Sequence, residues 1–592
     1  MPTAIVTGPP VPGSSLEGDL RSLGFDVRTA AGAAEAETLL AEVPGEERVA
    51  LVDTRFVGHV HALRLGLTDP RFPLSAVPGA VTAQRTGRQA LTRAMARENS
   101  ATGQGTGNGT LVEGLPDRVT AALDTDVHRP ELGSLVAAVP ADPQARNEAR
   151  QAVAAVDEEA VRLRSAVKAR DGFFTTFCVS PYSRHLARWC ARRGLTPNQV
   201  TTASLLTALI AAGCAATGTR AGFVAAAVLL LGSFVLDCAD GQLARYSLQY
   251  STLGAWLDAT FDRAKEYVFY AGLALGAART GDDVWALALG AMILQSCRHV
   301  VDFSFAEART GVAEGPAATL SGRLDRVGWT VWVRRMIVLP IGERWALIAV
   351  LTAATTPRVT FWVLLAGCAF AAAYTTAGRV LRSLRGGRAE DQAARALAHL
   401  ADGGPLSELL RRPWSRGGAA VAALGAVLVT GSALVWGAGW QTVLAAVAYV
   451  ICSAAVARPL TGRLDWLVPP LFRSAEYGTV LVLAADAEVN GALPAAYGLV
   501  SAVAYHHYDT VYRIRGDAGA PPRLLVRAIG GHEGRTLAVA VLAAVLTASG
   551  FTVALTALAV AVALVVLAES IRFWVAAHRG GAPAVHDEGE PA

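Results

Sequence analysis

Twelve long apolar runs, separated by loops rich in arginine, fill the chain from about residue 194 onwards. A helix that crosses a bilayer needs roughly 20 mostly apolar residues, and its backbone polar groups must be satisfied within the segment. The runs therefore predict a mostly α-helical, polytopic membrane protein, with six spans followed by about six more. They lie near residues 199–217, 221–236, 255–277, 283–303, 344–356, 359–378, 417–437, 441–457, 475–487, 491–508, 536–549 and 551–573.

The composition of the 592 residues supports a membrane environment, because 52% of them are hydrophobic and the mean hydropathy is +0.36. The net charge of +4 gives no general basicity that would favour a nucleic acid partner. The seven cysteines show neither the CxxC spacing of a zinc site nor the pairing of a disulfide framework. We therefore expect membrane lipids around the chain and no metal at its cysteines.

The distribution of arginine sets the expected orientation. The first residues lack the charged start and apolar core of a signal peptide, so the N-terminus is expected to stay in the cytoplasm. Most of the arginine-rich loops then fall on the same side as the N-terminus, which satisfies the positive-inside rule. We expect an integral protein of a bacterial plasma membrane with both termini cytoplasmic.

The first 57 residues follow a different pattern, in which short apolar strands alternate with helices. Such alternation is typical of a parallel α/β unit, so a small Rossmann-like domain is predicted. Its first strand runs into Gly8-Pro-Pro-Val-Pro-Gly13, which is neither a GxGxxG fingerprint nor a P-loop. Prolines also remove backbone amides that would hold phosphate, so the pattern favours a degenerate or regulatory domain.

Four regions follow from these patterns. A glycine- and threonine-rich stretch at 102–114 is expected to be a loop, and a charged helix is expected between about 141 and 172. The next segment carries four arginines and several aromatic residues, as expected of a helix that lies on an anionic membrane surface. The predicted regions are an α/β domain at 1–115, a helical linker at 116–169, a first membrane domain at 170–385 and a second at 386–592.

Four aspartates with helical spacing mark the candidate site. Asp237 and Asp240 are three residues apart, and Asp258 and Asp262 are four apart, so each pair lies on one face of a helix. Bare carboxylates are costly in a membrane, which makes such clusters functional candidates with a cation as partner. Oxygen ligands suit Mg²⁺ or Mn²⁺, which neutralise the charge of a diphosphate. Individually, each acid is also explained by helix capping or by pairing with Arg245 or Arg263.

Small and basic residues complete this constellation. Gly241 and Ala244 leave room for a base or a phosphate beside the helix, and Arg245 offers a fork of donors to phosphate. The full stretch is Asp237-Cys-Ala-Asp240-Gly241-Gln-Leu-Ala244-Arg245, then eight residues, then Gly254-Ala-Trp-Leu-Asp258-Ala-Thr-Phe-Asp262. Eight specified positions in register argue against a chance match.

This stretch resembles the motif of the CDP-alcohol phosphatidyltransferase family, DxxDGxxARx8GxxxDxxxD, at every fixed position. The resemblance covers about residues 170–385 and implies a six-helix bundle with a cytoplasmic site, Mg²⁺ or Mn²⁺ as cofactor, and a homodimer. It implies that a CDP-activated lipid such as CDP-diacylglycerol donates its substituted phosphate group to an alcohol, with release of CMP. By resemblance, the metal ligands are Asp237, Asp240, Asp258 and Asp262, the last also being the general base, and the CDP pocket contains Asp240, Gly241, Ala244, Arg245 and Gly254.

A positive pocket for a phosphorylated acceptor is the weakest part of this interpretation. The segment 338–344 resembles family members that use phosphorylated inositol, and nearby cations would hold an acceptor phosphate. Positive-inside topology alone also places arginines there. The acceptor candidates are Lys265, Arg298, Arg334, Arg335 and Arg344.

The second half contains polar clusters but no second DGxxAR. They suggest either a second site or substrate-binding partner, or interfacial capping and ion pairing. A faint echo links Arg263-Ala-Lys-Glu266-Tyr267 with Arg473-Ser-Ala-Glu476-Tyr477, which suggests a duplication. For the whole chain, the alternatives to an enzyme are a transporter or lipid-binding protein that retains the transferase fold, and for the second half a scaffold or dimerisation module.

Overall fold

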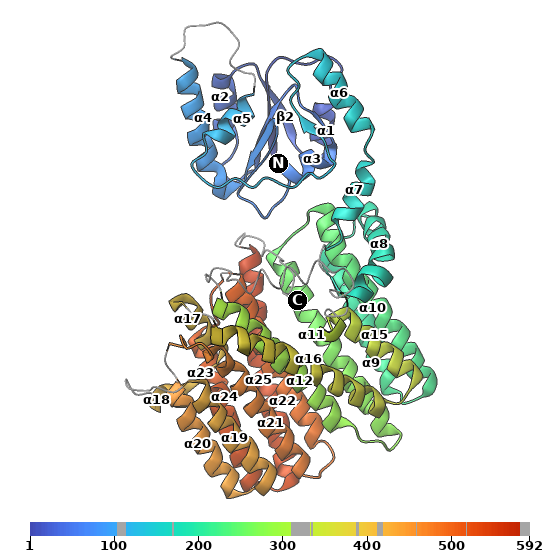
Figure 1. Cartoon of the computed structure of the whole chain (residues 1–592), viewed down its shortest axis with the longest axis vertical. Helices are drawn as coiled ribbons and strands as arrows, with labels where there is room; N and C mark the ends of the chain where they lie inside the picture. Colours follow the sequence, from blue (N-terminus) through green and yellow to red (C-terminus); the bar gives the residue numbers. More distant parts are fainter. Residues whose placement is uncertain are drawn as a thin grey trace.

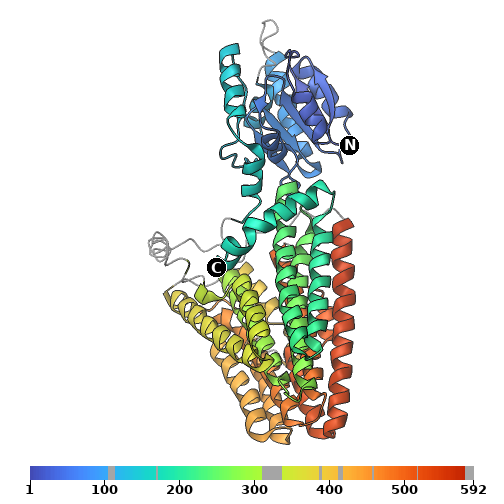
Figure 2. The ribbon, with the colours of Figure 1, turned by 90° about the vertical axis from the view of Figure 1, so that its right-hand side faces the viewer.

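An α/β domain sits at one end of a bundle of long helices, and two helices connect the two parts (Figures 1 and 2). The computed structural model describes residues 1–103, 114–168, 171–309, 332, 336–385, 390–410, 418–456, 459–516 and 518–579. The loop expected at 102–114, apart from its first two residues and its last, lies outside these residues.

The N-terminal domain is built on a five-stranded sheet of order β2-β1-β3-β6-β5. β1 pairs in parallel with β2 and β3, as the alternating pattern predicts, whereas β6 pairs antiparallel with β3 and β5. The β5–β6 hairpin was not predicted. The strands are β1 (Thr3–Thr7), β2 (Asp26–Ala30), β3 (Val49–Asp53), β5 (Leu74–Val77) and β6 (Ala80–Ala83), and a separate short ladder joins β4 (Val57–Gly58) to β7 (Ala137–Ala138).

Helices cover both faces of this sheet. Ile5 and Leu51 pack into one buried cluster and their neighbours Val6 and Val52 into another, because side chains alternate between the faces of a strand. The first cluster includes residues of α2, α4 and α5, and the second includes residues of α1 and α3. The helices are α1 (Leu16–Ser22), α2 (Ala33–Glu42), α3 (Val60–Leu67), α4 (Arg88–Gly103) and α5 (Leu115–Ala121).

Two helices, rather than the one expected, connect this domain to the bundle. α6 (Pro143–Ala154) ends before Asp157, whose carboxylate accepts a hydrogen bond from the amide of Ala160 at 3.1 Å and begins α7 (Glu158–Ser165). Arg162 of α7 donates to the carbonyl of Tyr246 at 2.9 Å and lies 3.6 Å from the centre of its ring. Arg71 of the α/β domain likewise lies 3.9 Å from the ring of Tyr250, so the domain is docked directly on the bundle.

Most of each apolar run of the sequence lies in one helix of the described chain, although several helix ends differ from the predicted bounds by a few residues. Five of these helices are long and apolar enough to cross a membrane by length and composition. The helices before residues 310–331, a stretch outside the described residues, are α8 (Ser180–Arg192), α9 (Pro197–Ala216), α10 (Arg220–Ser247), α11 (Thr252–Arg279) and α12 (Trp285–Arg309). Those after it are α15 (Ile341–Ala354) and α16 (Pro357–Arg385).

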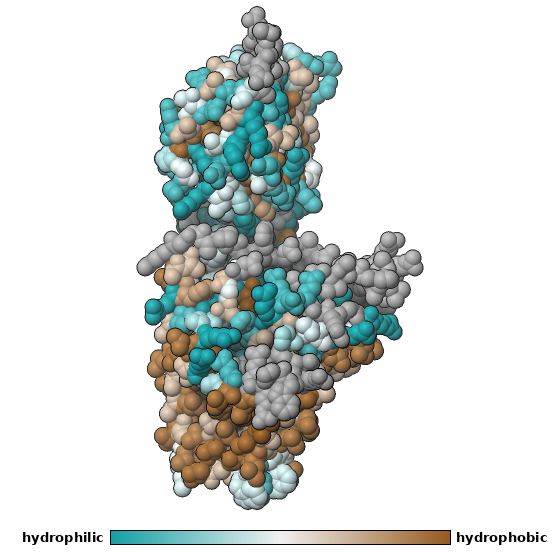
Figure 3. All heavy atoms as spheres, turned by 90° about the vertical axis from the view of Figure 1, so that its left-hand side faces the viewer, coloured by the Kyte–Doolittle hydropathy of each residue, from teal (hydrophilic) through white to brown (hydrophobic). Residues whose placement is uncertain are grey.

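A second set of helices completes the bundle. It contains α17 (Asp391–Leu400), α18 (Pro405–Leu410), α19 (Ala419–Trp436), α20 (Trp440–Val456), α21 (Val468–Asp486), α22 (Ala492–Arg515), α23 (Arg523–Ala528), α24 (Gly531–Val545) and α25 (Ala548–Arg579). On the face shown in Figure 3, exposed apolar side chains form a belt over the part of the bundle far from the α/β domain. Exposed apolar residues of the bundle helices include Val435, Leu444, Val553 and Leu564. This belt is the surface expected of an integral membrane protein.

A buried histidine predicts how the α/β domain responds to pH. His61 on α3 is 2% exposed, and neither of its ring nitrogens has a hydrogen-bond partner in the described chain. Burial, and then the positive charge of Arg162, lowers the pKa of His61 from 6.5 to about 3. The unfolded form therefore binds more protons between these two values, and stability is lost as the pH falls below about 6.5.

We expect the opening free energy of α3 to fall by about 2 kcal/mol between pH 7 and pH 5. Hydrogen exchange of the α3 amides, corrected for the intrinsic effect of pH, measures this change. His61→Leu should remove it, whereas a substitution of the exposed His185 to Asn should not. Equal pH dependence in wild type and His61→Leu would contradict this account.

Candidate active site

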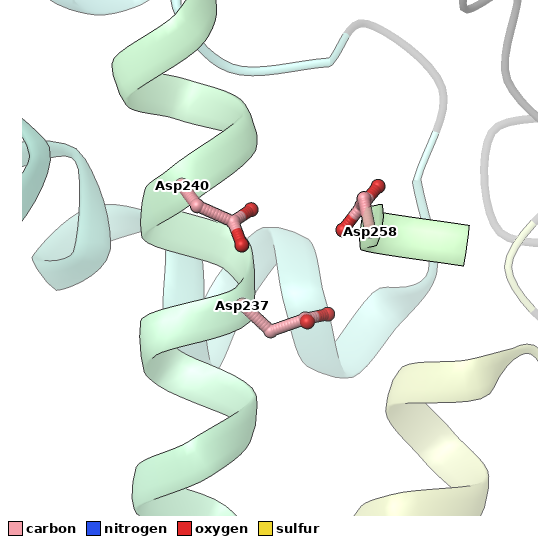
Figure 4. Close-up of side chains that lie close together, drawn as sticks. All are labelled: Asp237, Asp240 and Asp258. Atoms are coloured by element: carbon pink, nitrogen blue, oxygen red, sulfur yellow. The ribbon is translucent and has the colours of Figure 1, made fainter. Parts of the chain in front are cut away.

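Three carboxylates from two helices converge at the end of the bundle that faces the α/β domain. Asp237 and Asp240 lie one turn apart near the end of α10, and Asp258 lies in the first turns of α11 (Figure 4). Ser251 fixes the start of α11, because its hydroxyl accepts a hydrogen bond from the amide of Gly254 at 2.9 Å. One oxygen atom from each aspartate lies within 4.8 Å of the others.

This donor set fits a divalent cation. Asp240 is 3% exposed, and its Oδ2 atom has no hydrogen-bond partner in the described part of the chain. A buried carboxylate oxygen without a donor is costly unless a cation neutralises it. Oxygen-only ligation favours Mg²⁺ or Mn²⁺ over softer metals. Asp237, Asp240 and Asp258 are therefore the residues that would hold such an ion.

Lys265 lies among the acids rather than in a separate acceptor pocket. Its side chain is fully buried, and Nζ contacts Asp237 and lies 3.3 Å from Oδ1 of Asp262. Asp262 is thus close to the acidic group but paired with an ammonium, and it is not one of the three residues whose oxygens converge. The structure brings all four aspartates to one place, with Lys265 as their internal counter-charge.

The small residues of the motif lie where backbone must come close to other groups. A Cβ atom at Gly254 would be 2.8 Å from the side-chain oxygen of Asn198, so glycine lets the start of α9 approach α11. A Cβ atom at Gly241 would be 3.4 Å from the guanidinium of Arg245. Arg245 also donates from Nε to the carbonyl of Ala166, 2.6 Å away. Gly241, Ala244, Arg245 and Gly254 all remain partly exposed.

The arginines expected at the acceptor are placed differently from one another. Arg344 makes two hydrogen bonds to Glu266, at 2.9 and 3.1 Å, and is 2% exposed. Arg298 donates to the carbonyl of Val338. Arg334 and Arg335 lie outside the described residues. The structure therefore places Arg344 in an ion pair between α15 and α11, and acceptor binding by these arginines stays a prediction.

Sequence reasoning missed the contacts that α11 makes with α22 and α25. The ring of Trp256, which lies within the motif, stacks on Trp574 of α25 with centroids 5.9 Å apart. The ring of Tyr508 on α22 lies 5.1 Å from the guanidinium of Arg263. These partners are more than 240 residues away along the chain, and no local pattern connects them.

A comparison with known families now identifies both membrane regions. Residues 194–373 match the model of the CDP-alcohol phosphatidyltransferases. This segment is a CDP-alcohol phosphatidyltransferase domain. It contains all eight motif positions and the convergent acids, and members of this family generally use a divalent metal. Residues 391–592 match a family of unknown function, DUF5941.

Curated relatives of the transferase domain carry names of inositol lipid enzymes. A phosphatidylinositol phosphate synthase from Streptomyces avermitilis is 31% identical over 26% of this chain and 59% of its own length. An archaetidylinositol phosphate synthase from Pyrococcus horikoshii is 31% identical over 19% of this chain and 58% of its length. A bifunctional IPC transferase and DIPP synthase from Rubrobacter xylanophilus is 44% identical over 14% and 18%. The chain thus spans less than two thirds of each relative.

The geometry predicts that divalent cations bind at the three convergent aspartates. We expect Asp240→Asn to weaken Mn²⁺ binding by at least tenfold, because it removes a buried anionic ligand from the set. Electron paramagnetic resonance of Mn²⁺ titrated into the detergent-solubilised protein measures the affinity. Asp283→Asn, which makes the same charge change at the opposite end of α11, should leave it unchanged. Unaltered Mn²⁺ affinity in Asp240→Asn would place the ion elsewhere.

Replacing Lys265 tests its role as the internal counter-charge. Lys265→Met leaves Asp237 and Asp262 without their buried cation, and breaking a buried pair costs about 3–5 kcal/mol. We expect a lower unfolding temperature in EDTA, with a larger rise on adding Mg²⁺ than in wild type. Arg279→Met, at the exposed far end of the same helix, is the matched control. A Lys265→Met protein as stable as wild type in EDTA would contradict this role.

Proposed function

We propose that the chain is a membrane enzyme of phospholipid biosynthesis that transfers a substituted phosphate group from a CDP-activated lipid to an alcohol. The observation that carries the proposal is the convergence of Asp237, Asp240 and Asp258 within an intact family motif. The family match of residues 194–373 and the names of the relatives support the same reaction class. A CDP-diacylglycerol type of donor suits a site that opens at the end of membrane helices.

The chain's own residues then have distinct tasks. A divalent cation held by the three aspartates would supply positive charge to the diphosphate of the donor. Arg245, beside Gly241, is placed to contact the donor's nucleotide or phosphate. Asp262 is the proposed base, because its carboxylate lies beside the acidic group and is 19% exposed. Lys265 holds Asp262 and Asp237 in position from the buried side.

The proposed step balances as a direct displacement. The acceptor hydroxyl gives its proton to Asp262, and its oxygen forms a bond to the β-phosphorus of the donor. The bond between that phosphorus and the oxygen bridging to the α-phosphate breaks. CMP leaves with the electron pair, and the lipid phosphate is joined to the acceptor. No oxidant or further substrate is required.

A polyol phosphate is the proposed acceptor. Two of the relatives are named phosphatidylinositol phosphate synthase and archaetidylinositol phosphate synthase. Because Arg344 is engaged by Glu266, we assign the acceptor phosphate to Arg298 and to Arg334 and Arg335. We further propose that the end bearing the acids and the α/β domain faces the cytoplasm, where CDP donors and sugar phosphates are available.

The test is release of CMP by purified protein in detergent with CDP-diacylglycerol and Mg²⁺ or Mn²⁺. We expect release that depends on inositol phosphate and that falls by at least a hundredfold in Asp262→Asn, since general bases contribute about 10²–10⁴ to rate. Glycerol phosphate and free inositol identify the acceptor by comparison. Asp302→Asn, outside the motif, controls for charge removal. Donor binding without CMP release across all acceptors would favour a lipid-binding protein instead.

A further inference from the structure

The two sets of membrane helices share one pattern of neighbours. In the first set, α9 packs on α10 and α11, α10 packs on α15, and α12 packs on α16. In the second set, α19 packs on α20 and α21, α20 packs on α24, and α22 packs on α25. The short helix before each set, α8 or α18, packs on the second helix of that set. These helix pairs therefore correspond one to one between the two sets.

An ion-pair clamp recurs at matching places in the two sets. In α11, Glu266 pairs with Arg263 three residues earlier, and Nε and Nη2 of Arg344 on α15 donate to Oε1 and Oε2 of Glu266 at 2.9 and 3.1 Å. In α21, Glu476 pairs with Arg473 three residues earlier.

Arg535 on α24 completes the second clamp. Its Nε and Nη2 atoms donate to Oε1 and Oε2 of Glu476 at 2.6 and 3.3 Å. The same atoms thus meet in both clamps. Each clamp joins the third helix of its set to the fifth, which are α11 and α15 in the first set and α21 and α24 in the second. The faint sequence echo at Arg-x-x-Glu-Tyr is in this way a repeated three-dimensional contact.

A second contact is repeated beside each clamp. Glu343, one residue before Arg344, accepts a hydrogen bond from the amide of Phe174 at 3.3 Å, just after the pair Asp171-Gly172. Glu533, two residues before Arg535, accepts from the amides of Gly404 and Ser407 at 3.0 and 3.1 Å, just after Asp402-Gly403. In both sets, a glutamate at the start of the fifth helix anchors the chain that precedes the first.

The two sets face each other reciprocally. α11 packs on α22, α12 packs on α21, and the fourth helices α12 and α22 pack on each other. Such exchange of equivalent contacts is the signature of a twofold interface, here within a single chain. An approximate twofold relation between the sets follows.

The second set has lost the acids. Relative to the shared arginine, Val468 and Phe472 occupy the places that Asp258 and Asp262 have in α11. α20 contains no aspartate or glutamate between Trp440 and Val456. Phe472 instead stacks on His532 with ring centroids 4.2 Å apart. No convergent acid group is found among the described residues of this set.

We propose that the C-terminal region is a degenerate second copy of the transferase bundle and serves as the built-in partner of the catalytic copy. One chain then holds one acidic site and needs no second chain to complete its fold. The duplication is supported by the repeated contacts alone. The catalytic role of the first copy rests on the proposed function. The resemblance to the family implied a homodimer. Here the C-terminal copy takes the place of the second subunit.

The partner copy holds α11 in place through contacts from α22 and α25. Trp574 stacks on Trp256, and the ring of Tyr508 lies under Arg263. The hydroxyl of Tyr497 donates to the carbonyl of Tyr267 at 2.7 Å. These contacts hold α11 against α22 and α25, so they influence where Asp258 and Asp262 stand relative to Asp237. Trp574 and Tyr508 are therefore positioning residues.

The particle mass tests the built-in partner without any assay of activity. Light scattering coupled to size exclusion, corrected for detergent, should give one 61.6 kDa chain per particle across a range of protein concentrations. Two chains per particle would overturn the proposal, even if the enzyme is active. A single chain without CMP release would leave the built-in partner supported and contradict only the proposed function.

Substitutions of Trp574 and Tyr508 test whether the partner copy positions the acids of α11. We expect Trp574→Ala to lower kcat and to weaken Mn²⁺ affinity, each by about tenfold, since displacing a catalytic group by about 1 Å costs up to about a hundredfold. Trp574→Phe, which keeps a ring against Trp256, should restore both. Tyr508→Phe should match wild type, because the ring over Arg263 remains, whereas Tyr508→Ala should not.

A purely structural role of Trp574 predicts a different result. Trp574→Ala would then lower the yield and the unfolding temperature but leave Mn²⁺ affinity and kcat per folded chain unchanged. Exposed Trp362 on α16 offers the matched control, Trp362→Ala, which should alter none of these. Wild-type Mn²⁺ affinity in folded Trp574→Ala would overturn the positioning role.

Discussion

Neutralising buried carboxylates is the constraint on which the bundle depends. Moving an unpaired acid out of water costs several kcal/mol, so each buried acid must have a cation or donors beside it. The chain meets this need in two ways. Glu266 and Glu476 are each held by two arginines, which ties the third helix of each set to the fifth. Among the acids of α10 and α11, Asp237 and Asp262 pair with the buried Lys265, and the acid cluster fits a divalent cation.

The difference between the two sets follows from which residues surround the clamp. In the first, Asp258 of α11 points towards Asp237 and Asp240 of α10. In the second, Asp402 enters from the preceding chain and pairs with Arg473 and Arg535 at 2.9 and 2.8 Å. Its charges are therefore mutually satisfied. The same framework thus supports a reactive centre in one place and a closed ionic core in the other.

Much of the fold could be predicted from periodicity and hydropathy. The parallel strands β1, β2 and β3 and the helix behind each apolar run are local features, and the structure has them where the patterns indicate. The β5–β6 hairpin was missed because its strands are only four residues long and lie within a mixed segment. The break between α6 and α7 was missed because Asp157 is as compatible with a charged helix as with a cap.

The site could be predicted only where the separation of two residues along one helix decides whether their side chains lie close together. Asp237 and Asp240 share a helical face by their separation of three, which sequence reveals. Lys265 meets Asp237 across 28 positions, and Arg344 meets Glu266 across 78, so their partners depend on how helices pack. Both residues were therefore expected at the acceptor, on charge alone. The Trp256–Trp574 stack spans the two membrane domains and has no counterpart in any local pattern.

The short connection between the α/β domain and the bundle has a mechanical consequence. The carbonyl of Ala166, at the end of α7, accepts the hydrogen bond that orients Arg245, and Arg162 of the same helix grips Tyr246. Because α7 also meets α3 through Glu158, whose carboxylate accepts the amide of His61, the three elements are linked in series. A tilt of the α/β domain is thus transmitted through α7 to Arg245, the arginine proposed to contact the donor.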